Sequence, residues 1–200
     1  MTQVLNPSTM YDGPVVGWRD ITGPIVVKGV GANDPTWDQI GSGPFYAYNF
    51  ALNDECWIPF HIPHDIVPIN DDNTLETIKL YFHTHWITDG TNTNTVKWQF
   101  TFSHARGFGQ EAFDVATGTV VTAEEAASGT AYTHMVTETS GSTIANLTEP
   151  DGILYMHLKR ITNGGTDNTD NIYVLTSDIH YLSNSLGTYS KSPSFYIEHE

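Results

Sequence analysis

The sequence lacks most of the residue patterns on which enzymes depend. Cys56 is its one cysteine, which excludes an internal disulfide and any zinc cluster built from cysteines. Cys56 lies in the apolar run ECWIPF, so we expect a buried thiol that packs as a small hydrophobic side chain. No phosphate-binding loop, nucleophile elbow or dinucleotide fingerprint occurs, and no two carboxylates are placed to flank a cleft. The sequence therefore predicts no enzymatic activity, no catalytic residue and no cofactor.

Basic residues are also scarce. The chain has 8 Lys and Arg against 23 Asp and Glu, a formal net charge of -15 at pH 7. Nucleic-acid backbones require clustered Lys and Arg, and anionic membranes attract the same residues, so we expect neither partner. No apolar run approaches the length of a membrane span. The start, MTQVLNPSTMYDG, lacks the basic and apolar regions of a signal peptide. We expect a protein made in a host cytoplasm without a signal peptide.

Residues 74–106 dominate what the sequence does contain. Apolar residues alternate with polar ones at Leu80, Phe82 and Trp86 in a first run, and again from Val96 to His104 in a second. This period of two indicates two strands, each with one buried face. The intervening letters TDGTNTNT are turn formers. The pattern predicts a long antiparallel hairpin at the centre of a sheet, with Trp86 and Trp98 as core anchors.

Other strand-like runs complete the predicted fold. We expect an all-β protein, an antiparallel two-sheet sandwich of about eight strands that is jelly-roll-like. One short helix is expected at 122–129, with Thr122 as its N-cap. An irregular N-terminal arm at 1–24 would fold back on its own domain or dock on a neighbouring subunit, and the sandwich domain would span 25–200. The remaining strands are expected at 25–31, 44–52, 55–62, 130–139, 152–161 and 172–182.

Three polar or aromatic patterns are candidate binding sites. His83 and His85 would point the same way from one strand, and His180 could join them as a third metal ligand, similar to the H-x-H pattern of cupins. The Glu that cupins place a few residues later is missing, so hydrogen-bonded residues on a half-polar sheet face are favoured, and we expect no metal site. Trp37 in a loop could stack on a carbohydrate. Calcium could bind Asp and Asn side chains, but these are first of all turn formers: Asp65, Asp71, Asp72, Asp167, Asn168, Asp170 and Asn171.

The order of several short motifs resembles a family of tailed-bacteriophage and prophage virion structural proteins. The motifs, spread over about residues 17–190, are WRDITGPI, GANDPTW, FHIPHDIVP, YFHTHW, VKWQFTFSHA, GILYMHLKR and DIHYLSNSLGT. The positions that would match the family are His83, His85, Trp86, Trp98, Arg160, His180 and Gly187. No catalytic residue comes with this resemblance.

The resemblance implies a non-enzymatic protein of the virion. We expect most of all a capsid decoration (cement) protein that stabilises the head by bridging coat subunits, with the major capsid protein or other virion proteins as partners. Closed symmetry, a homotrimer foremost, would cover exposed aromatic strands. One alternative is a tail, neck or fibre component with a receptor- or carbohydrate-binding face. A cupin-like metalloprotein is the remote alternative.

Overall fold

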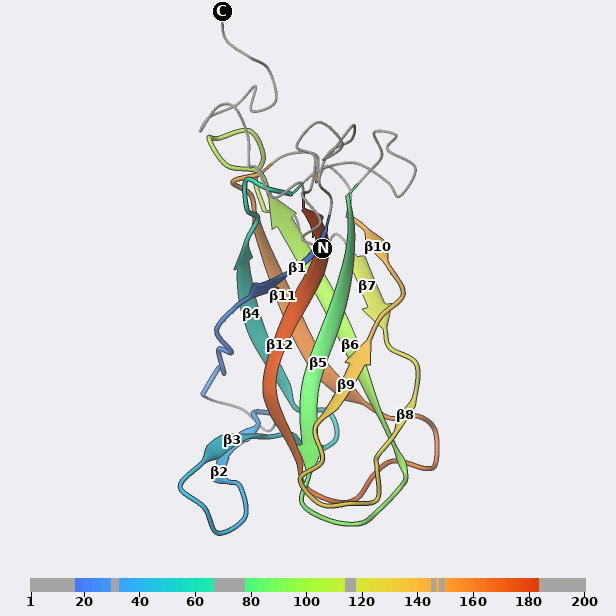
Figure 1. Ribbon diagram of the computed structural model, residues 1–200. Coiled ribbons are helices and arrows are strands. Elements are labelled where there is room, and N and C mark those ends of the chain that lie inside the picture. The colour runs from blue at the N-terminus through green and yellow to red at the C-terminus, as the bar shows by residue number, and fades with distance from the viewer. Residues whose placement is uncertain are drawn as a thin grey trace, which may run out of the picture.

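The fold is a sandwich of two antiparallel β-sheets. A computed structural model describes residues 17–29, 33–66, 78–113, 118–144, 147 and 150–183. Within these ranges the chain forms twelve strands and no helix, and the two sheets pack face to face (Figure 1). The predicted all-β, two-sheet architecture is confirmed, although several short strands raise the number above eight. No helix in the described ranges has the length and apolar character needed to cross a membrane.

The larger sheet has seven strands. Its main path runs β10-β5-β12-β3-β2, with β9 also paired to β5 and β1 also paired to β12. The long strands β5 and β12 form its centre, and they pair antiparallel with Asp178 opposite His83. Its strands are β1 (Gly17–Thr22), β2 (Thr36–Gln39), β3 (Tyr46–Asn49), β5 (Lys79–Thr88), β9 (Met135–Glu138), β10 (Ser142–Thr143) and β12 (Ile172–Ser183).

The smaller sheet has five strands in the order β4-β11-β6-β7, with β8 also paired to β6. β4 lies at its edge, and Pro59 in β4 agrees with the predicted edge position because proline cannot donate to a ladder. Its strands are β4 (Glu55–His61), β6 (Thr95–Ala105), β7 (Gly118–Val121), β8 (Glu125–Ala126) and β11 (Ile153–Ile161).

The core fills the space between the sheets with alternate residues from each strand. Phe82 of the larger sheet stacks on Phe100 and Phe102 of the smaller one, with ring centroids 5.5 and 5.3 Å apart. Trp86 and Trp98 are fully buried, as predicted, and the indole of Trp86 donates to Thr137 Oγ1 at 2.7 Å. The thiol of Cys56 is buried in the same core, where burial raises its pKa.

The predicted central hairpin is wrong. β5 pairs with β9, β10 and β12, whereas β6 pairs with β7, β8 and β11, so the two strands belong to opposite sheets. Residues 89–94 carry the chain from one sheet to the other. Alternation indicates which face of a strand is buried, but not which strand lies beside it. The alternation of β5 and β6 is therefore equally compatible with two strands that lie in opposite sheets and pack their apolar faces against each other.

The predicted helix at 122–129 is also wrong. Thr122 continues the edge of the smaller sheet instead: its backbone N–H donates to Trp98 O, and its Oγ1 accepts from the Trp98 N–H, both at 3.0 Å. Glu125 and Ala126 then form β8 against β6. The segment is short, and pairing with a preformed strand outweighs its weak helix preference.

Other predicted boundaries change in smaller ways. Within the predicted arm at 1–24, residues 17–22 form β1 and pair with β12 of the same chain, while residues 1–16 lie outside the described residues. The strand expected at 25–31 is reduced, among its described residues, to a single bridge between Val26 and Trp57. The strand expected at 130–139 is limited to β9. The division into an arm and a sandwich at residue 24 stays a prediction.

Candidate functional site

Seven charged or titratable side chains form a cluster on the outer face of the seven-stranded sheet. Leu80, Phe82, Thr84 and Trp86 of β5 point into the core, so the residues between them point outward. Strand register then sets the neighbours, because His83 lies opposite Asp178 on one side and Glu138 on the other, and His180 lies opposite Asp20. We call this group the histidine–carboxylate cluster: Asp20, His83, His85, His134, Glu138, Asp178 and His180.

His83 is at the centre of the cluster. Its Nδ1 lies 3.2 Å from Asp178 Oδ1, and its Nε2 lies 3.2 Å from Glu138 Oε2. The side chain is only 1% exposed, although it points away from the core. Neither ring nitrogen of His83 has an aligned hydrogen bond, and neither does Asp178 Oδ1. A buried imidazole therefore meets two carboxylates at 3.2 Å in poorly aligned contacts, where burial normally requires good hydrogen bonds.

His85 completes the contacts of Asp178. Its Nε2 lies 3.2 Å from the same Asp178 Oδ1, and its Nδ1 lies 2.9 Å from His134 Nε2, with the two rings stacked. Burial lowers the pKa of His85, and the imidazoles of His134 and His83 lower it further, against the opposing charge of Asp178. Burial raises the pKa of Asp178, but the surrounding imidazoles, His83 first, outweigh burial and hold that pKa below its usual range.

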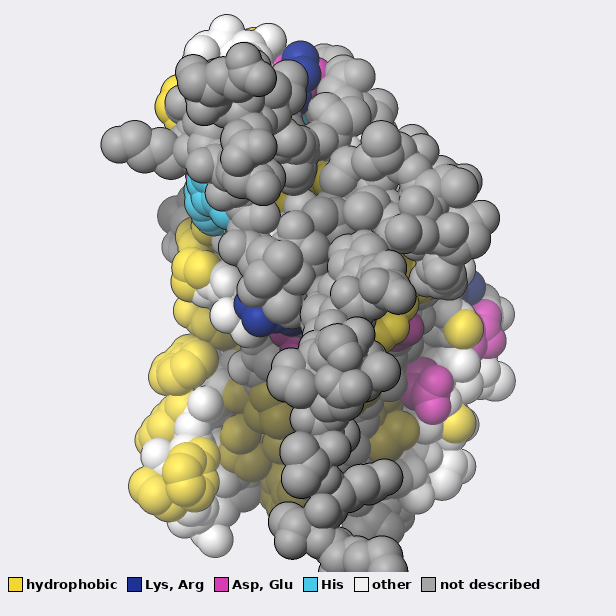
Figure 2. Space-filling view, turned by 45° about the horizontal axis from the view of Figure 1, so that its top comes forward, with side chains coloured by type: hydrophobic (Ala, Val, Ile, Leu, Met, Phe, Trp, Pro, Cys, Tyr) yellow, Lys and Arg dark blue, Asp and Glu magenta, His cyan; other side chains and the backbone are white. Residues whose placement is uncertain are grey.

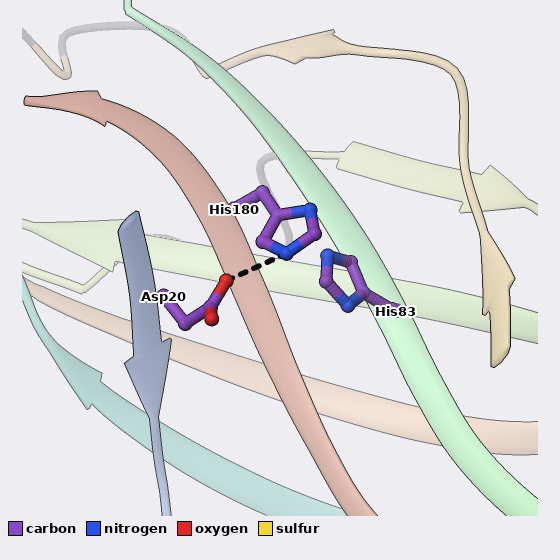
Figure 3. Close-up of side chains that lie close together, drawn as sticks. All are labelled: Asp20, His83 and His180. Carbon is purple, nitrogen blue, oxygen red and sulfur yellow. Dashed lines mark ion pairs between the residues drawn. The ribbon is translucent and has the colours of Figure 1, made fainter. Parts of the chain in front are cut away.

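His180 joins the cluster from the other side of His83. Its Nε2 lies 2.6 Å from Asp20 Oδ1, and its Nδ1 lies 2.9 Å from Glu138 Oε2. Its ring meets that of His83 edge to face, with centroids 3.6 Å apart, and Figure 3 shows the two rings side by side between β12 and β5. Two groups of donor atoms converge, His83 with His85 and Asp178, and His83 with His180 and Asp20, each within 4.8 Å.

The three histidines named from the sequence are thus neighbours in the structure. The sequence reasoning missed Asp178, Glu138, Asp20 and His134. A signal for Asp178 was present, since Asp178 and His180 are separated by one residue on a strand and must share a face. Glu138 and Asp20 come from strands whose register no local pattern specifies.

The aspartates named for calcium, where they are described, accept hydrogen bonds within a turn or from other segments of the chain. Asp167 accepts from Asn163 N and Thr162 Oγ1, and Asp170 accepts from Asn92 N. Asp65 accepts from Arg19, Tyr181 and Ser183. Asp71 and Asp72 lie outside the described residues.

A second surface feature is an apolar flank beside the β2–β3 hairpin. Trp37, predicted in a loop, lies on β2 and stacks on Tyr46 with ring centroids 6.3 Å apart and planes 14° apart. We call this surface the aromatic flank, and its exposed apolar residues are Trp37, Phe45 and Tyr46 of the hairpin and Leu175 of β12. A hollow of about 410 Å³ lies between Trp37, Tyr46 and Leu175. Figure 2 shows hydrophobic side chains along one side of the molecule, the side on which Figure 1 draws β2 and β3.

Comparisons with known proteins give likenesses of structure alone. No protein-family model matches the sequence, and no curated protein does. A family 35 carbohydrate-binding module from an environmental isolate has a TM-score of 0.41 at 9% identity, over 78% of this chain and 90% of that one. The CBM22-1 xylan-binding domain of Paenibacillus barcinonensis Xyn10C has a TM-score of 0.30 at 15% identity, over 82% and 85%.

A structure of infectious bursal disease virus, Gt strain, is also similar, with a TM-score of 0.40 at 9% identity. The match covers 93% of this chain but only 37% of the viral chain. Such low identities and TM-scores assign no function. The strand order shows an antiparallel β-sandwich. The histidine–carboxylate cluster lies on one of its outer faces, and the aromatic flank lies at the β2–β3 hairpin.

Proposed function

We propose that this chain is a non-enzymatic virion protein that binds other virion proteins through its aromatic flank. The finer form of the proposal is a decoration protein that bridges coat subunits on a tailed-phage head. The observation that carries it is the exposure of three aromatic side chains on one short hairpin: Phe45 is 71% exposed, Trp37 59% and Tyr46 49%. Exposed aromatic side chains gathered on one hairpin are typical of an interaction site.

The hairpin is placed to meet a partner. β2 is the last strand on its path through the larger sheet, and Figure 1 shows β2 and β3 projecting from one end of the sandwich. Among the described strands none pairs with the outer side of β2, so its backbone groups can extend a partner's sheet. Aromatic side chains beside such an edge supply the buried anchors that dominate interfaces. Many copies on one shell would add their weak contacts by multivalency.

The composition and the sequence resemblance support the same proposal. A net charge of -15 keeps an abundant surface protein soluble and away from packaged nucleic acid. The motif order resembles that of virion structural proteins, which need no active site. Neither observation distinguishes a position on the head from a position on the tail. The experiment therefore has to compare binding to heads with binding to tails.

The test is co-sedimentation of the purified chain with capsids that lack it. The wild-type chain should sediment with heads and not with isolated tails, and electron cryomicroscopy of the decorated heads should place the β2–β3 hairpin against coat subunits. The double variant Trp37→Ala/Phe45→Ala should lose about tenfold or more in affinity, as removal of interface anchors does. Light scattering would report whether the free chain is the expected trimer.

Tyr155→Ala is the matched control, because Tyr155 is another exposed aromatic residue but lies on β11 of the other sheet. It should bind heads as the wild type does. Equal sedimentation of the double variant and the wild type would overturn the role of the flank. Binding to tails alone would overturn decoration in favour of a tail, neck or fibre position.

Carbohydrate binding is the second candidate function, favoured by the stacked pair of Trp37 and Tyr46 beside the hollow. Aromatic faces of this kind hold the apolar face of a sugar ring. Tryptophan fluorescence would be followed during titration with soluble neutral oligosaccharides of bacterial surfaces. A saturable change that Trp37→Ala removes would support this role. No saturable change with any sugar, together with flank-dependent binding to heads, would leave protein docking as the flank's function.

A further inference from the structure

The histidine–carboxylate cluster contains three buried polar atoms that lack well-aligned hydrogen bonds. They are both ring nitrogens of His83 and Oδ1 of Asp178. Buried polar groups are almost always well hydrogen-bonded, so three poorly aligned atoms in one cluster favour a bound ion as an additional partner. His104 is likewise buried without an aligned hydrogen bond, but its contact with a carboxylate among the described residues, Glu111, is longer at 3.8 Å. His83 differs from His104 because two further donor atoms, Nε2 of His85 and Oδ1 of Asp178, lie close to its Nδ1.

The distances from Asp178 Oδ1 to the two imidazoles match those between ligands of a metal site, and the donor atoms of all three residues lie within 4.8 Å of one another. Asp178 Oδ1 lies 3.2 Å from His83 Nδ1 and 3.2 Å from His85 Nε2. Ligands about 2.0–2.1 Å from a tetrahedral Zn²⁺ are about 3.3 Å from one another. Nitrogen and carboxylate oxygen are the donors that suit Zn²⁺ and related divalent transition metals.

We propose that His83 Nδ1, His85 Nε2 and Asp178 Oδ1 form a binding site for a divalent transition-metal ion of the Zn²⁺ class. The site joins β5 to β12 across the centre of the larger sheet. It departs from the sequence-based expectation of no metal, which the experiment below also tests. It is independent of the aromatic flank, so either proposal can fail alone.

The second nitrogen of each histidine has its own neighbour, as metal-bound histidines require. His83 Nε2 lies 3.2 Å from Glu138 Oε2, and His85 Nδ1 lies 2.9 Å from His134 Nε2. An N–H on each of these outer nitrogens would leave the inner nitrogens, Nδ1 of His83 and Nε2 of His85, as lone-pair donors. Glu138 ends β9, and His134 directly precedes the first residue of that strand. One segment beside β5 therefore orients both His83 and His85.

The site would be reached from the side of His85. The His85 side chain is 22% exposed, compared with 7% for Asp178 and 1% for His83. Three protein ligands leave one position of a tetrahedral ion for water or for a donor atom from a partner. The competing triangle of Asp20, His83 and His180 uses more exposed side chains, since that of Asp20 is 51% exposed and that of His180 38%.

The first test uses the full wild-type chain, stripped with EDTA and titrated with Zn²⁺ in a calorimeter. We expect one ion per chain and a rise in the unfolding temperature. Co²⁺ in place of Zn²⁺ should give the strong visible absorption of a four- or five-coordinate site. Histidine nitrogen NMR of the wild type should show Zn²⁺-dependent shifts at His83 Nδ1 and His85 Nε2. Absence of saturable binding, or shifts at His180 instead, would overturn the assignment without any variant.

Variants then identify the ligands. Asp178→Asn is nearly isosteric and should weaken Zn²⁺ binding by more than about 100-fold, and Glu138→Gln by about 10-fold, the range of an outer-shell partner. His157→Ala is the control, because His157 contacts a single carboxylate, Glu55, at 3.0 Å on the other sheet, and this variant should bind Zn²⁺ normally. Unchanged binding by Asp178→Asn, or loss on Asp20→Asn but not on Asp178→Asn, would overturn the proposed ligand set.

Discussion

The two outer faces of the sandwich contain the same kinds of residue in different surroundings. On the five-stranded sheet His157 Nε2 contacts Glu55 Oε2 at 3.0 Å, and its ring stacks on Trp57 with centroids 5.3 Å apart. Both of its partners are half-exposed, like most side chains of that face. On the seven-stranded sheet His83 meets Asp178 and Glu138 at similar distances, but it is buried and its nitrogens lack aligned hydrogen bonds.

This difference shows that composition alone does not mark a site. A histidine beside a carboxylate is an ordinary surface pair when water reaches both, and such pairs contribute little to stability. The same pair becomes expensive when it is buried, because the charges lose their hydration. Two further imidazoles beside His83 make that cost larger, and a bound cation would compensate it. Burial without satisfied hydrogen bonds is therefore what separates the two faces.

The largest expected effect comes from removing the carboxylate on each face. Asp178→Ala should lower the free energy of unfolding by about 3 kcal/mol, at the lower end for a broken buried pair because the imidazoles can release their protons. Glu55→Ala should lower it by no more than about 1 kcal/mol. Urea unfolding of both variants with EDTA present would measure this. Equal losses would show that the two faces do not differ.

A smaller effect is expected from a buried charge whose partners are satisfied. Arg160 on β11 donates to the carbonyl oxygens of Phe50 at 2.7 Å and of Asn168 at 2.5 Å. Arg160→Met should lower the free energy of unfolding by about 2 kcal/mol, because both carbonyls lose a charged donor but an adjacent hollow of about 420 Å³ lets water replace it.

Lys97→Met is the comparison for Arg160. Lys97 makes an exposed pair with Glu124 at 3.3 Å, and its loss should change stability by less than about 1 kcal/mol. Denaturant unfolding would compare the two variants: both lose a positive charge, but only Arg160→Met also removes hydrogen bonds to buried carbonyl groups. If Arg160→Met were as mild as Lys97→Met, the carbonyl contacts would not be stabilising.

The sequence predicted the faces of the strands better than their partners. Alternation from Leu80 to Trp86 and from Val96 to His104 correctly placed the buried and outer residues of β5 and β6, because period two is a local property. It could not tell that β5 and β6 lie in opposite sheets, because pairing depends on strands far apart in sequence. The same limit concealed β1 and β2, which are short and whose pairing with β12 and β3 is set by tertiary structure.

The candidate site shows the same limit. His83 and His85 were identified from their spacing on one strand, and His180 from its position on another long strand. Asp178 joined them only through the register of β12 against β5, and Glu138 only through that of β9. Burial of His83 on an outward-facing position is a tertiary property, so no sequence pattern could reveal the unpaired nitrogens that distinguish the site.

The smallest expected effect concerns Asp65, a carboxylate whose partners form well-aligned hydrogen bonds, unlike the 3.2 Å contacts of Asp178 Oδ1. Tyr181 and Ser183 donate to it at 2.8 and 2.7 Å, and Arg19 at 2.8 Å. Burial raises the pKa of Asp65, but these hydrogen bonds and the charge of Arg19 outweigh burial and hold the pKa below its usual range. The stabilisation is therefore complete above the unfolded pKa of about 3.9 and is lost as pH falls through the lower folded pKa.

Asp65→Asn should consequently lower stability at neutral pH and flatten its decline below about pH 4, as measured by thermal unfolding across the acid range. Tyr181→Phe removes one donor and should give an intermediate slope. If Asp65→Asn left both the neutral-pH stability and the acid slope of the wild type unchanged, the hydrogen bonds would not stabilise the carboxylate. Asp65 would then resemble Glu55, which is partly exposed, more than a buried group with satisfied hydrogen bonds. Hydrogen bonding would no longer explain how the fold accommodates its other buried charges.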